Sequence, residues 1–111
     1  MATANSGSLP GSPFDDPRFD SSILKWIRLL HASTLRNCAQ REGLLTLEQL
    51  SDLRRRERND GTAEHNTALI RIISRKGRSG YIALCRAIKG LRLYATRLTE
   101  MQELLAPSER V

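Results

Sequence analysis

The chain has 111 residues, of which 40% are hydrophobic, and its formal net charge is +6. This length fits one small domain and leaves no room for a second. Residues 1–20 hold three acidic side chains and one basic side chain, so the rest of the chain carries 17 basic against 9 acidic residues, a net charge of +8. Such a basic domain favours acidic protein surfaces, nucleic acid or anionic lipid as partners.

The sequence lacks the patterns that enzymes and metal sites need. His31 and His65 are its only histidines, and neither has a cysteine or carboxylate at metal-ligand spacing. There is no phosphate-binding glycine loop, paired-carboxylate motif or nucleophile elbow. We therefore expect neither an enzyme nor a bound cofactor.

The cellular setting is predicted from what the chain does not contain. No segment is long and apolar enough to span a bilayer, and the first residues lack the basic start and apolar run of a signal peptide. Cys38 and Cys85 fall within helical apolar stripes, which favours buried thiols in a reducing compartment over a disulfide framework. We expect a cytoplasmic protein with no membrane partner, although anionic lipid ranks third among the possible ligands.

Residues 1–20 are expected to precede the folded domain. Their first part, 2–13, is rich in Ser, Gly, Ala and Pro without periodicity, which predicts a disordered leader. The remainder is a short acidic and aromatic bridge in which Phe14 and Phe19 are expected to cap the domain. The first helical amides are expected to be capped by one of three polar residues, Asp20, Ser21 or Ser22.

Two helices are predicted next. The first has apolar residues at helical spacing, with Lys25 and Arg28 on the opposite side; its apolar positions are Ile23, Trp26, Ile27 and Leu30. Trp26 is expected in the core. The second helix follows a cap at Ser33 or Thr34 and ends at Gly43, and its apolar positions are Leu35, Cys38 and Ala39.

The third helix has the clearest start signal. Thr46 and Gln49 form a capping box, which precedes Leu47, Leu50 and Leu53. The helix continues into Arg54, Arg55 and Arg56, since basic residues are favourable near a helix end. A turn is expected at Asn59, Asp60 and Gly61.

Three further helices complete the predicted bundle. The fourth spans 62–73, the fifth 79–88, and a sixth after Gly90 carries Tyr94, Leu98 and Met101. A basic turn of Arg75, Lys76 and Arg78 joins the fourth and fifth, and Tyr81 is expected in the core with its hydroxyl at the surface. Because each helix has one apolar stripe to bury, we predict an all-α, six-helix antiparallel bundle over residues 21–106, with 107–111 as a C-terminal tail.

The third to fifth predicted helices also resemble a known family. The blocks GLLTLEQLSDLR and LIRIISRKGRSGYIALCRAI resemble the caspase recruitment domain (CARD), a member of the death-domain superfamily. The glycine, two leucines and threonine before the third helix match, as do the aliphatic run, basic residue and glycine that end the fourth. Gly-Tyr-Ile-Ala at 80–83 is most similar to CARDs of coiled-coil scaffold proteins in immune signalling.

The resemblance implies a death-fold bundle of Greek-key type and a non-enzymatic adaptor in apoptotic or innate-immune signalling. Such adaptors bind another copy of the same fold through complementary charge. The resemblance places a basic surface on the first and fourth helices, which we define as Lys25, Arg28, Arg71, Arg75, Lys76 and Arg78.

The matching acidic surface is interrupted. It would comprise Glu42, Glu48 and Asp52, but Arg54, Arg55 and Arg56 follow directly, so these six residues make a mixed second surface. Like charges oppose head-to-tail stacking of identical copies. We therefore expect a CARD-containing partner with an acidic surface in preference to strong self-association.

Nucleic-acid binding is the alternative from another class. Arginine outnumbers lysine, which suits phosphate contacts, and the fourth and fifth helices could present several cations to a backbone. Against this, aromatic content is only 5%, which is low for stacking on single strands, and no helix has the Asn, Gln and Arg run that reads base edges. Phosphate binding would weaken steeply with salt, whereas a packed protein interface would weaken less.

Overall fold

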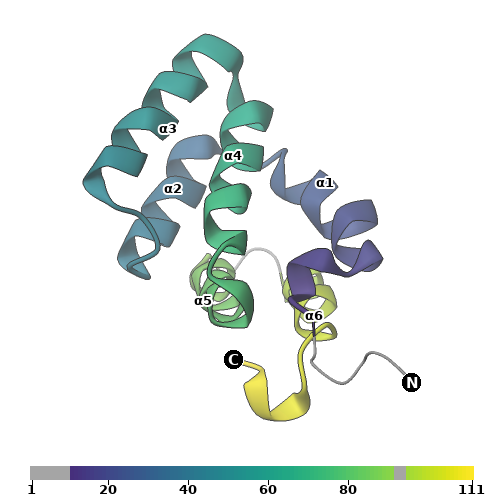
Figure 1. Ribbon diagram of the computed structural model, residues 1–111. Helices are drawn as coiled ribbons and strands as arrows, with labels where there is room; N and C mark the ends of the chain where they lie inside the picture. Colours follow the sequence, from purple (N-terminus) through teal and green to yellow (C-terminus); the bar gives the residue numbers. More distant parts are fainter. Residues whose placement is uncertain (1–10, 92–94) are drawn as a thin grey trace.

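The computed structural model describes residues 11–91 and 95–111, and within these ranges it contains helices and no strand. Six α-helices pack into a bundle (Figure 1), which confirms the all-α prediction. Their bounds are Leu24–Ile27 for α1, Ala32–Arg41 for α2, Leu47–Asp60 for α3, Thr62–Ser74 for α4, Gly77–Gly90 for α5 and Ala95–Gln102 for α6.

α5 is the central helix of the bundle. It packs against α2, α4 and α6, and seven of its side chains or backbone positions are buried. Tyr81, Leu84 and Ile88 form its largest contribution to the core. Cys38 and Cys85 are free and buried, as predicted, and burial raises the pKa of the Cys85 thiol to about 12.

The chain before α1 packs into the bundle. A 3-10 helix, η1, spans Pro13–Asp15, and a π-helical turn, η2, spans Phe19–Ile23 directly before α1. Asp16 Oδ1 accepts a hydrogen bond from the Arg18 amide at 2.9 Å, and Pro17 opens the helical stretch. The predicted caps at 20–22 are wrong, because those residues lie inside η2.

Three aromatic rings fix this segment to α5. Phe14 lies edge-to-face on Phe19 and on Tyr81, with ring centroids 5.1 and 5.0 Å apart. Phe19 and Tyr81 are buried, and the Tyr81 hydroxyl donates to the Met101 carbonyl at 2.7 Å. The expectation that this hydroxyl reaches the surface is wrong, since α6 covers it and supplies the acceptor.

The boundary between the first two helices also differs from the prediction. α1 ends at Ile27, so Leu30 lies in the bend that follows, and α2 begins at Ala32 with His31 as its N-cap residue. Ser33 and Thr34, the expected caps, lie within α2. Trp26 is half-buried against the core.

The capping box at the start of α3 is confirmed. Thr46 Oγ1 accepts from the Gln49 amide and Gln49 Oε1 accepts from the Thr46 amide, at 3.1 and 3.0 Å. α3 continues through the expected turn to Asp60 and ends at Gly61. α5 begins at Gly77, two residues before the predicted start, because Gly77 adopts φ +65°, a left-handed conformation that reverses the chain after α4.

The last residues of the chain, from α6 onward, pack against the bundle. Met101 is buried and Leu98 is half-buried, as the predicted stripe requires, whereas Tyr94 lies outside the described residues. A 3-10 helix, η3, spans Pro107–Glu109 within the predicted C-terminal tail, and Val111 packs against the core.

Candidate interaction surface

Exposed cations without an ionic partner gather on two neighbouring helices. α3 and α4 pack closely and lie side by side (Figure 1). α3 buries only Leu50 and Leu53, so most of its other side chains face solvent. Within the described residues, five exposed cations on α3, on α4 or in the turn that follows make no ion pair: Arg54, Arg58, Arg71, Arg75 and Lys76.

A groove of about 270 Å³ runs between these two helices. Three arginines line it: Arg56 from α3, Arg71 from α4 and Arg75 from the turn directly after α4. Among its lining residues Asp52 alone carries a carboxylate, and Arg55 already donates to that carboxylate at 2.8 Å. We call this the α3–α4 groove; its remaining lining residues are Gln49, Leu53, Ala68 and Ile72.

The structure divides the basic surface predicted from the sequence. Arg71 and Arg75 lie in the α3–α4 groove, and Lys76 follows in the turn after α4. Lys25 is exposed on α1, and Arg28 lies 3.9 Å from Glu64 in the first turn of α4. Seven residues along α4 separate Glu64 from Arg71, about 10 Å of helix axis, so Arg28 lies well apart from the groove.

Arg78 is the exception among the six predicted cations. Its guanidinium is half-buried, pairs with the Glu109 carboxylate and donates to the Gly11 carbonyl at 3.1 Å. The pairing lowers the pKa of Glu109 to about 2. Arg78 therefore ties both ends of the described chain to the start of α5 and presents no unpaired charge.

The second predicted surface is largely neutralised. Glu42 pairs with Arg86 of α5 at 3.1 Å, and Asp52 pairs with Arg55. Glu48 and Arg54 are both exposed, and neither makes an ion pair among the described residues. Arg56 pairs with Asp60 only at 3.9 Å.

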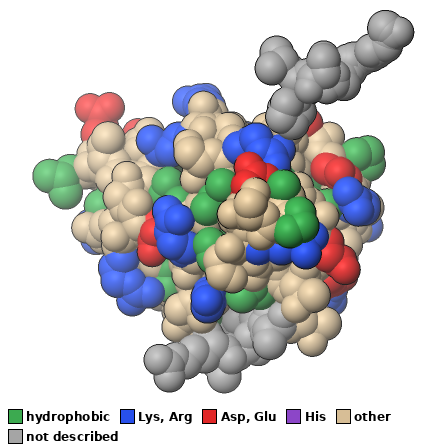
Figure 2. Space-filling view, turned by 90° about the horizontal axis from the view of Figure 1, so that it is seen from below, with side chains coloured by type: hydrophobic (Ala, Val, Ile, Leu, Met, Phe, Trp, Pro, Cys, Tyr) green, Lys and Arg blue, Asp and Glu red, His purple; other side chains and the backbone are tan. Residues whose placement is uncertain are grey.

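The face seen from below (Figure 2) carries side chains of both charges. Figure 2 shows the face that lies lowest in Figure 1, where lysine and arginine side chains are spread among acidic ones. On α6, Arg97 pairs with Glu100 at 2.8 Å.

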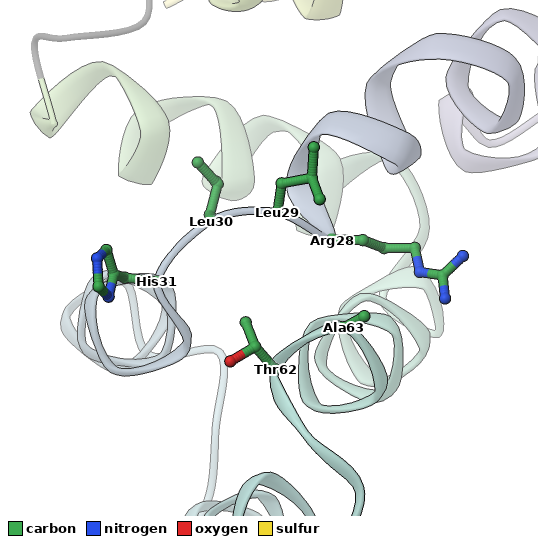
Figure 3. Close-up of a pocket in the computed structure, with 6 residues that line it drawn as sticks. All are labelled: Arg28, Leu29, Leu30, His31, Thr62 and Ala63. Carbon is green, nitrogen blue, oxygen red and sulfur yellow. The ribbon is translucent and has the colours of Figure 1, made fainter.

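A second hollow lies where the α1–α2 turn meets the start of α4 (Figure 3). Its volume is about 370 Å³, and its lining is Arg28, Leu29, Leu30, His31, Thr62 and Ala63. Leu29 is 82% exposed at the rim, and the Arg28 side chain points outward. We did not predict this hollow, because we expected one helix to run through Leu30.

A buried polar network holds that turn against α4. Asn66 Nδ2 donates to the carbonyls of Ile27 and Leu30 at 2.8 and 2.9 Å. Asn66 Oδ1 lies 2.7 Å from His65 Nδ1, and His65 Nε2 lies 3.1 Å from Arg36 Nη1. The network thus joins α1, α2 and α4.

The geometry of the network fixes the protonation of His65. The guanidinium of Arg36 has only donors, so His65 Nε2 accepts and Nδ1 carries the hydrogen that is donated to Asn66. This is a neutral imidazole. Burial, assisted by the charge of Arg36, lowers the pKa of His65, while Glu57 of α3 accepts from Arg36 at 2.9 Å and balances its charge.

The sequence contains one sign of this network. His65 shares a helical stripe with Leu69 and Ile73, at i, i+4 and i+8, so it falls on the buried face of α4. Arg36 carries no local signal, because it meets His65 across 29 residues, and neither do the bonds of Asn66 to Ile27 and Leu30, which span 39 and 36 residues. Within the described residues, no three potential metal ligands lie together.

Comparison with protein-family models, with curated proteins and with solved structures finds no match to this chain. In the part of the chain that the structure describes, every helix is too short or too polar to cross a bilayer.

Proposed function

We propose that this chain is a non-enzymatic interaction module of the CARD type that binds an acidic death-fold partner. The helical bundle and the residues of the third to fifth predicted helices support the family assignment. The paired acids and unpaired cations of the surface support the choice of partner. The Greek-key arrangement of a death fold is part of this proposal.

One observation carries the proposal. Eight of the twelve acidic residues lie in ion pairs within the described part of the chain. Five exposed cations on α3, on α4 or in the turn after α4 make no ion pair there. The exposed charge that remains for a partner is therefore mostly positive, which favours association with an acidic surface.

The same pairing disfavours strong self-association. A second copy would need an exposed acidic face to meet the cations of the first copy. Glu42 and Asp52, two of the three acids expected on that face, are already paired with arginines of this chain. A heterotypic partner with its own unpaired carboxylates avoids that competition.

Mixing with folded acidic death-fold domains tests the proposal. We expect a complex at physiological salt, measured by size-exclusion chromatography with light scattering. The double variant Arg71→Glu/Arg75→Glu is expected to abolish it. The control Lys89→Glu/Arg110→Glu makes the same change in net charge at exposed positions outside the α3–α4 groove, and it is expected to keep the complex.

Absence of a complex with every acidic domain tested would contradict the proposal. Duplex or single-stranded nucleic acid is the comparison ligand. Tight binding to it at physiological salt, with affinity falling steeply as salt rises, would favour the nucleic-acid alternative.

A further inference from the structure

We propose that the α3–α4 groove binds an acidic linear segment of a partner protein, in which carboxylates alternate with a small apolar side chain. This inference rests on the proposed function and names the chemistry that the groove recognises. It concerns a short stretch of chain, whereas the proposed function concerns a folded domain.

The charge of the groove selects an anion. Arg71 and Arg75 make no ion pair among the described residues, and the pairing of Arg56 with Asp60 is long, at 3.9 Å. Each guanidinium presents a planar set of donors that matches a carboxylate, so an incoming acidic side chain gains paired hydrogen bonds.

The two walls of the groove supply cations from opposite sides. Arg71 lies in the last turn of α4 and Arg75 follows four residues later as its C-cap residue, whereas Arg56 lines the groove from α3. Like charges at this spacing repel each other in the free protein. A carboxylate between them removes that repulsion, so an acidic ligand is expected to stabilise the folded protein as well as bind to it.

The floor and size of the groove favour a peptide. Ala68 and Ile72 are half-buried in it and offer apolar contact between the cations. The volume of about 270 Å³ lies below the range of roughly 300–1,000 Å³ that is usual for small-molecule pockets, and it suits one or two side chains of a partner. No aromatic side chain is among its lining residues, so bases have nothing there to stack on.

The acidic segment of this chain is held elsewhere. Its residues 14–19 pack against α5 through Phe14 and Phe19, and Asp16 pairs with Arg18 at 3.0 Å. Among the described residues, this acidic segment therefore does not occupy the groove.

Fluorescence anisotropy with labelled peptides tests the inference at physiological salt. The probe is a short peptide in which glutamates alternate with alanines, and its counterpart carries glutamine at every glutamate. We expect the acidic peptide to bind and the glutamine peptide not to bind. Arg56→Gln and Arg71→Gln are each expected to weaken binding roughly three- to tenfold, as loss of one charge-assisted contact at a partly exposed site implies.

Arg54→Gln is the matched control. Arg54 is an exposed cation on the same helix as Arg56 but does not line the groove, so its loss is expected to change affinity by less than about twofold. Equal weakening by Arg54→Gln and Arg71→Gln would overturn the inference, because diffuse charge would then explain binding. Displacement of the peptide by an oligonucleotide of the same charge at physiological salt would also overturn it.

Binding of a folded acidic death-fold domain separates the two proposals. A wild-type protein that binds the domain but no acidic peptide would contradict the groove inference and leave the proposed function standing. A protein that binds neither would contradict both.

Discussion

His65 lies fully buried between Arg36 and Asn66, and the Arg36 guanidinium, which can only donate, requires the neutral imidazole with Nε2 as acceptor. Protonation at Nε2 would place a second cation against the Arg36 guanidinium and remove the acceptor that it uses. The folded state therefore resists the proton that the unfolded chain takes up at its ordinary pKa of about 6.5. The other charged group at this site, Glu57, accepts from Arg36, and its negative charge opposes the lowering of the His65 pKa without reversing it.

The free energy of unfolding is expected to fall as the pH is lowered below about 6.5, where His65 of the unfolded chain takes up a proton. Because its folded pKa is lowered, the free energy of unfolding is independent of this residue above about pH 6.5 and decreases below it, by up to about 1.4 kcal/mol per pH unit. Urea unfolding at about pH 7.5 and about pH 5.5 measures the difference, in a range where the carboxylates remain ionised. His65→Gln is expected to flatten the dependence, and an unchanged slope in that variant would show that His65 is not its source.

The Tyr81 hydroxyl is a second buried polar group with a defined role. It donates to the Met101 carbonyl, which also accepts a bond from the Leu104 amide. Tyr81→Phe leaves that acceptor one partner, so we expect a loss of only about 1 kcal/mol in the free energy of unfolding. Ser79→Ala, which removes an exposed hydroxyl from the same helix, is the control and is expected to change stability by less than about 0.5 kcal/mol. Equal effects of the two substitutions in urea unfolding would refute this role for Tyr81.

α4 and α5 approach each other closely at Gly80. A Cβ atom there would lie 2.6 Å from the Ile73 carbonyl oxygen and 2.8 Å from Lys76 Cβ, so α4 and α5 can meet at this angle only without a side chain. Gly80→Ala is expected to destabilise the bundle by about 2 kcal/mol, since backbone has to move to accommodate it.

Gly90→Ala is the paired control on the same helix. Its added Cβ would lie no closer than 3.6 Å to a flexible arginine side chain, so the change is expected to be neutral or slightly stabilising. Thermal unfolding of both variants measures the contrast. A Gly80→Ala protein as stable as the wild type would show that the α4–α5 contact is looser than the structure has it.

Elements whose boundaries depend on neighbouring residues were predictable from the sequence. The α3 start follows from Thr46 and Gln49, whose side chains bond each other's backbone amides within one turn. The buried stripes of α4 and α5 follow from the helical spacing of residues such as Leu69 and Leu84.

Boundaries that depend on distant residues were not predictable. The end of α1 is held by Asn66, which donates to Ile27 and Leu30 from 36 to 39 residues away. The loss of Arg78 from the basic surface has the same cause, since Glu109 lies 31 residues further along the chain. For the candidate surface, the sequence indicated Arg71 and Arg75, but the contribution of Arg56 required the packing of α3 on α4.

The molecule has a net charge of +6, and within the described residues the charged side chains that make no ion pair are mostly positive. Most of its carboxylates are taken up by internal pairs, several of which join different elements, as Glu42 with Arg86 and Glu109 with Arg78 do. These pairs are mostly exposed and add little stability individually. Their main consequence, within the described residues, is that the exposed charge left unpaired on α3, on α4 and in the turn after α4 is mostly positive.

The oligomeric state of the protein alone tests this account most directly. We would measure its mass by light scattering across a concentration series at physiological ionic strength, with the wild type beside Arg71→Glu/Arg75→Glu. The account predicts a monomer at every concentration for the wild type, because eight of its twelve acidic groups are already paired within the chain. Filaments or larger species that grow with concentration and disappear in the charge-reversed variant would contradict it, since they would show that the cations of one copy find their partner on the next.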